Sequence, residues 1–111
     1  MPGTEYVGEF EYLILLALLR LGRDAYGTTV RAEIERRGRR VASTSAVHTT
    51  LDRLEQKGLV RSRIGPSTPQ RGGKRKRHYE LLAPGVRALR QSHSTFKRMT
   101  DGLEGLLEPS S

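Results

Sequence analysis

Apolar residues recur at helical spacing through the first third of the chain. Between Glu9 and Leu21 they fall three and four apart, and further leucines widen the stripe almost to the whole circumference. Tyr26, Val30 and Ile34 then follow at intervals of four. This pattern predicts a deeply buried first helix, followed by a shorter amphipathic helix that ends in "RRGRR".

The segment "STSAVHTTLDRLEQKG", residues 43–58, predicts a third helix with two different faces. Val47, Leu51 and Leu54 form an apolar seam, while hydroxyl side chains precede the helix and Gly58 follows it as a stop. The opposite face carries short or polar side chains: Ser45, His48, Thr49, Asp52 and Gln56. That face can approach another surface closely.

Two stretches of alternating apolar and polar residues, 59–64 and 77–82, predict strands joined by a long loop. The loop contains "RGGKRKR", and its two glycines allow a close backbone approach to another molecule. A β-hairpin with a basic tip is therefore expected.

A last helix is predicted to begin at Pro84, with a coiled-coil rhythm of steps of three and four. Its seam consists of Val86, Leu89, His93, Phe96, Thr100, Leu103 and Leu107. Gly102 and Gly105 each cost about 1 kcal/mol relative to alanine in a helix. This helix therefore needs another surface to pack on.

Positive charge is concentrated in the hairpin loop. The formal net charge is +8, and residues 66–83 carry five Lys or Arg side chains against one acidic side chain, whereas residues 1–22 are acidic. Such a distribution favours a polyanionic partner at the loop.

Three helices followed by a basic hairpin are the element order of a winged helix-turn-helix. The expected fold is mainly α with a β-hairpin: a DNA-binding domain at residues 1–83 and a C-terminal dimerisation helix at residues 84–108. In this fold the third helix enters the major groove of duplex DNA while the hairpin contacts the backbone. The expected DNA-binding residues are Thr44, Ser45, His48, Thr49, Arg71, Lys74, Arg75 and Lys76.

A homodimer is expected for two reasons. The first helix carries more apolar surface than one small domain covers, and the seam of the last helix has no surface left to meet within its own chain. Two-fold symmetry would place the third helices about 34 to 36 Å apart, so the operator should be an inverted repeat. The expected interface residues are Leu13, Leu16, Leu89, Phe96, Met99, Leu103, Leu106 and Leu107.

Several function classes are disfavoured. The chain has no cysteine and three scattered histidines, so we expect no redox chemistry, metal site or cofactor. His48 and Asp52 lie one helical turn apart without a nucleophile turn nearby, so enzyme activity is not expected. The apolar runs are too short to cross a membrane and the start is acidic, so a cytoplasmic location is expected.

The segments "GEFEYLILLALL", "AYGTTV", "SAVHTTLDRLEQKGLV" and "RGGKRKRHYELLAPG", with one C-terminal helix, resemble the PadR family of bacterial transcriptional regulators over nearly the whole chain. The resemblance implies the short form of the family, a homodimer joined through the last helix, and a protein that usually represses transcription. It also implies a cavity at the dimer interface that can bind small effectors. Family members commonly carry a DNA-contacting tyrosine where this chain has His48, whose imidazole can also donate or accept a hydrogen bond.

Two alternatives stay open. A basic winged-helix module can bind RNA, or it can serve as a dimeric protein-interaction adaptor. RNA binding by stacking favours exposed aromatic residues among the cations, and the basic loop has none before Tyr79, so DNA is the preferred partner. For His48, the sequence does not decide between a DNA-facing and a plain surface histidine.

Overall fold

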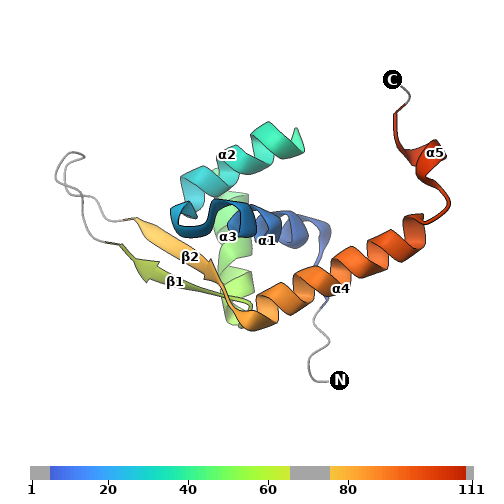
Figure 1. The fold of residues 1–111 in the computed structure, drawn as a ribbon. Helices are drawn as coiled ribbons and strands as arrows, with labels where there is room; N and C mark the ends of the chain where they lie inside the picture. Colours follow the sequence, from blue (N-terminus) through green and yellow to red (C-terminus); the bar gives the residue numbers. More distant parts are fainter. Residues whose placement is uncertain (1–5, 66–75, 110–111) are drawn as a thin grey trace.

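Residues 6–65 and 76–109 are described by a computed structural model, in which helices are followed by a hairpin and a long C-terminal helix (Figure 1). The elements are α1 (Glu9–Leu21), α2 (Gly27–Gly38), α3 (Thr44–Gln56), β1 (Val60–Ile64), β2 (Arg77–Leu81), α4 (Ala83–Thr100) and α5 (Glu104–Leu107). A short 3-10 turn, Gly22–Asp24, joins α1 to α2. The predicted order of elements is confirmed, with small shifts at their ends.

Helix α1 supplies the centre of the core. Ile14 and Leu15 are completely buried, and α1 contacts α2, α3, α4 and β2. The helix ends at Gly22, whose φ of 59° is readily adopted only by glycine. Leu19, however, is 59% exposed, so this chain alone leaves part of the wide apolar stripe of α1 uncovered.

Helices α2 and α3 pack against α1 through the apolar seams that the sequence predicts. Val30 and Ile34 of α2 are buried, as are Val47, Leu51 and Leu54 of α3. The Ser43 hydroxyl accepts a hydrogen bond from the backbone N–H of Ala46 at 3.0 Å, which caps the first turn of α3.

The hairpin is fastened to the segment before α2 along the outer edge of β2. Strands β1 and β2 are antiparallel, with a register that runs from Val60 opposite Leu81 to Ile64 opposite Arg77. On the outer edge of β2, the N–H of Tyr79 donates to the carbonyl of Ala25 at 2.8 Å. The segment just before α2 therefore pairs with β2 through a single isolated bridge, Tyr26 opposite His78.

The first half of α4 packs on its own chain. Ala88 and Leu89 belong to the core, and the rings of Phe96 and Tyr12 lie 5.5 Å apart. The expectation that the seam of the last helix has no surface of its own chain to meet is therefore wrong for this half. It applies only farther along α4, which extends away from the other helices (Figure 1).

The single helix expected through Leu107 is broken. Helix α4 ends at Thr100, and α5 is a separate single turn. Gly102, with a φ of 85°, lies in the break and needs the conformational freedom of glycine. The coiled-coil rhythm therefore does not continue through Leu103 and Leu107 on one straight helix.

Candidate nucleic-acid interface

The outer face of α3 is polar and open to solvent, as the sequence predicts. Thr44, Ser45, His48 and Thr49 are all exposed, whereas Val47 on the other side of the helix is 1% exposed. The first acidic residue on this helix is Asp52, in its third turn. The first two turns can therefore approach a negatively charged surface without like-charge repulsion.

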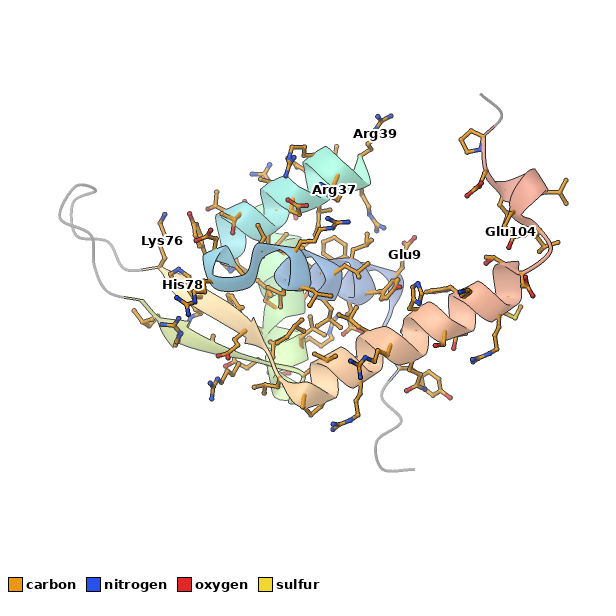
Figure 2. The ribbon with its side chains drawn as sticks, in the orientation of Figure 1. Glu9, Arg37, Arg39, Lys76, His78 and Glu104 are labelled. Carbon is orange, nitrogen blue, oxygen red and sulfur yellow. The ribbon has the colours of Figure 1, made fainter. Side chains whose placement is uncertain are left out.

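The loop end of the hairpin lies beside the start of α2, where Figure 2 labels Lys76 and His78. The Nζ of Lys76 donates to the hydroxyl of Tyr26 at 3.1 Å and lies 4.2 Å from the centroid of its ring. The His78 ring meets the same tyrosine edge-on at 5.3 Å. Tyr26 is thus covered by two side chains of the hairpin.

His48 connects this cluster to α3. A methyl group at Gly27 would lie 3.0 Å from Cε1 of His48, so the imidazole rests against the first turn of α2. Tyr26, Gly27, Thr28, His48, Lys76 and Arg77 together line a shallow hollow of about 180 Å³. Of the predicted DNA-binding residues, His48 and Lys76 are brought together here.

The loop between β1 and β2 is the wing of this fold. Three of its predicted DNA-binding cations, Arg71, Lys74 and Arg75, lie outside the described residues. At the base of the wing, Nη1 of Arg77 donates to the Ser62 hydroxyl at 2.9 Å, and Ser62 in turn donates to Glu55 of α3. The position of Arg77 is therefore linked through Ser62 to Glu55, in the last turn of α3.

Three arginines at or just after the end of α2 have carboxylate partners. Arg36 and Arg37 pair with Glu33 at 2.8 and 3.0 Å, and Arg40 pairs with Glu9 at 2.8 Å. Hydrogen bonding from Arg37, which outweighs the opposing effect of burial, holds the pKa of Glu33 below its usual value. Part of the positive charge between residues 31 and 40 is therefore neutralised within the chain. By contrast, Lys76 contacts a neutral tyrosine.

Tyr26 is a site residue that sequence reasoning missed. The spacing of Tyr26, Val30 and Ile34 suggested an ordinary position on the apolar seam of the second helix, but Tyr26 precedes the first helical residue. Its contact with Lys76 joins residues fifty positions apart in the sequence. Local spacing carries no signal for such a contact.

The predicted interface residues fall into three groups. Leu89 is buried in its own chain, so it is not available at the surface. Leu13 and Leu16 line an open groove of about 250 Å³ between α1 and α2. The remaining side chains are exposed to between 44% and 85%: Phe96, Met99, Leu103, Leu106 and Leu107.

Within residues 6–65 and 76–109, no group of three His, Asp or Glu side chains converges closely enough to hold a metal ion. No helix in the same ranges combines the length and the apolar character needed to cross a bilayer.

The arrangement of three helices, an antiparallel hairpin and an exposed polar third helix defines a winged-helix protein. The chain belongs to the transcriptional regulator PadR-like family, whose model matches residues 15–91, well over half of the sequence. The chain matches no curated protein.

Solved structures share this fold. A PadR family transcription regulator from hypervirulent Clostridium difficile is 22% identical with a TM-score of 0.72, over 91% of this chain and 100% of that one. F93 from STIV, a winged-helix DNA-binding protein, is 22% identical with a TM-score of 0.67, over 86% and 95%. Bacillus subtilis PadR, in complex with operator DNA, is 23% identical with a TM-score of 0.65, over 76% of this chain and 46% of that one.

Proposed function

We propose that this chain represses transcription by binding, as a homodimer, to an inverted-repeat operator in duplex DNA. The observation that carries the proposal is the grouping of exposed His48 on α3 with Lys76 and Arg77 around one hollow. Membership of the PadR-like family and the operator complex of the Bacillus subtilis protein support duplex DNA as the partner. The role places the protein in the bacterial cytoplasm, in contact with the nucleoid, and includes no catalytic step.

In this proposal α3 reads the bases and the hairpin binds the backbone. The first two turns of α3 present Ser45, His48 and Thr49, whose side chains can donate or accept hydrogen bonds at base edges in the major groove. Lys76 and the wing cations neutralise phosphates and release counterions, which supplies affinity for any duplex. Specificity then comes from α3 and affinity largely from the wing.

RNA binding or an adaptor role is the second candidate, and the cluster at Tyr26 weighs against RNA. Single-stranded RNA is commonly bound by stacking its bases on exposed aromatic rings. Lys76 lies over one face of the Tyr26 ring and His78 contacts the ring edge-on, so this aromatic side chain is already engaged within its own chain. The geometry therefore favours a duplex.

The dimer part of the proposal rests on exposed apolar side chains. Met99 and Leu106 are 71% and 85% exposed, and the open groove at Leu13 and Leu16 offers a second apolar surface. A partner copy that covers both would remove these side chains from water. A small effector bound at such an interface would shift DNA affinity if it favoured one dimer geometry.

Selection of bound sequences from a randomised duplex library tests the proposal. The wild-type protein should enrich an inverted repeat whose half-sites lie about 34 to 36 Å apart. His48→Ala should change the preferred base at one position per half-site by about 1–3 kcal/mol. His93→Ala, at an exposed position on α4, should leave the base preference unchanged. Enrichment of no motif by the wild type would contradict the proposal.

A further inference from the structure

The dipeptide Tyr26–Gly27 contacts both elements to which the proposed function assigns DNA binding. Tyr26 touches Lys76 and His78 of the hairpin, and Gly27 lies against His48 of α3. The inference drawn from this geometry rests on that proposed function. It concerns how α3 and the hairpin are held in a fixed position relative to each other.

The backbone of this dipeptide is held from two directions. The N–H of Tyr26 donates to the Thr29 hydroxyl at 3.0 Å, and its carbonyl accepts from the N–H of Val30 at 2.9 Å, which fixes it to α2. Tyr26 also pairs with His78 in an antiparallel β-bridge. The residue is therefore a fixed point between α2 and β2.

The Tyr26 side chain restrains a lysine that would otherwise rotate freely. Lys76 is exposed and has a long, flexible side chain, but its ammonium lies over the ring and donates one hydrogen bond to the hydroxyl. An ammonium has three donors, so two remain for a phosphate. A restrained cation loses less conformational entropy on binding than a free one.

Glycine at position 27 is not explained by its backbone. Among the described residues the positive-φ glycines are Gly22, Gly58 and Gly102, so Gly27 adopts a conformation open to any residue. Alanine would also favour the helix more strongly. A Cβ at this position, however, would lie 3.0 Å from Cε1 and 3.2 Å from Nε2 of His48. The missing side chain makes room for the imidazole.

We propose that Tyr26 and Gly27 are positioning residues. In each half-site they set the distance between the His48 imidazole, which contacts a base, and the Lys76 ammonium, which contacts a phosphate. Tyr26 holds the Lys76 ammonium at the base of the wing, and Gly27 seats the His48 ring against α2. The two residues are adjacent on a backbone that is fixed to both α2 and β2. The hairpin loop and α3 are therefore held at a constant distance from each other.

Tyr26→Leu tests the first part on the sequence selected by the wild type. Its affinity should fall about fivefold at 0.15 M salt, and the slope of log K against log salt should flatten by about 0.9, which corresponds to one phosphate fewer neutralised by the protein. Tyr26→Phe keeps the ring face and should retain the wild-type slope. Lys76→Met should flatten the slope equally, and adding Tyr26→Leu to it should change nothing more.

A purely structural role for Tyr26 gives a different result. Tyr26→Leu would then lower the melting temperature but keep the slope, and its effect would add to that of Lys76→Met; either outcome overturns the inference. If Tyr26→Leu does not fold, the inference is tested with Lys76→Met and Tyr26→Phe. An unchanged slope of log K against log salt in Lys76→Met overturns the inference.

Gly27→Ala tests the second part without removing a functional group. The variant should melt at or above the wild-type temperature, because the imidazole can shift by a few tenths of an ångström and alanine favours the helix. Its discrimination at the base read by His48 should nevertheless fall about fivefold or more. The same change in a His48→Ala background should have no further effect on base preference.

The outcomes distinguish a failure of the positioning role from a failure of the proposed DNA-binding function. If the wild type selects no duplex, both are overturned. If the wild type selects a motif and Gly27→Ala and Tyr26→Leu bind it with unchanged base preference and salt slope, only the positioning role is overturned.

Discussion

Glu11 shows how one buried charge joins the two ends of the helical core. Its carboxylate accepts hydrogen bonds from the N–H of Gly8 at 2.8 Å and from Nζ of Lys57 at 3.1 and 3.0 Å. Burial alone would raise the pKa of Glu11, but these hydrogen bonds and the charge of Lys57 together hold it below the ordinary value of 4.5. The start of α1 is thereby fastened to the end of α3.

The lowered pKa of Glu11 predicts a loss of stability in acid. Below its ordinary value of 4.5, the unfolded chain binds a proton that the folded chain does not, so the free energy of unfolding falls as the pH drops through the folded pKa. Above pH 4.5 the contribution is fully present. Urea unfolding at a series of pH values should show this decline, and Glu11→Gln should decline less steeply. Equal slopes for the two proteins would contradict the assignment.

Single residues differ in how much of their role the sequence predicts. The exposed face of α3, with Ser45, His48 and Thr49, follows from helical spacing alone. The roles of Tyr26 and Glu11 depend on contacts with Lys76 and Lys57, about fifty positions away in each case. Such contacts are set by the packing of whole elements and leave no local pattern.

At the scale of elements, periodicity predicts all helices and strands except the last helix. The apolar residues from Val86 to Leu107 keep the same intervals along the sequence on both sides of Gly102. These intervals carry no information on a change of backbone direction, so the break at Gly102 does not show in the pattern. The glycines were the only local signal of the break. The docking of the first half of α4 on α1 was equally hidden from the sequence.

Gly85 fixes the position of α4 on the body of the protein. A methyl group at Gly85 would clash with the carbonyl oxygen of Leu59, which also accepts a hydrogen bond from the N–H of Leu82. Gly85→Ala should therefore lower the free energy of unfolding by about 1–3 kcal/mol or more, measured by urea unfolding. Gly105→Ala, with no atom within 4 Å, should change it by less than about 0.5 kcal/mol. Equal stability of the two variants would contradict this docking.

The wing should act through its charge. Replacing Lys74, Arg75 and Lys76 with alanine should weaken binding to every duplex and flatten the slope of log K against log salt by about 0.9 for each phosphate that the wing no longer neutralises. The base preference should stay the same, because phosphate contacts carry no direct sequence information. Fluorescence anisotropy over a range of salt concentrations measures both quantities. An unchanged salt slope would remove the wing from the proposed interface.

At the scale of the whole molecule, the exposed apolar side chains predict self-association. Sedimentation equilibrium at micromolar concentration should find the wild type as a dimer, and Met99→Glu with Leu103→Glu as a monomer that no longer binds the operator. Ser94→Glu, on the face of α4 opposite Phe96, should remain a dimer. A well-folded wild-type monomer would contradict the proposed interface and the inverted repeat that follows from it.

Two copies of this chain should bind one duplex and recognise its base sequence. Titration of the selected duplex at a concentration well above Kd, followed by sedimentation, should give two chains per duplex. A shuffled duplex of the same composition should bind at least about a thousandfold more weakly at physiological salt. Equal affinity for the selected and shuffled duplexes, or tighter binding to RNA of the same sequence, would contradict sequence-specific binding to duplex DNA.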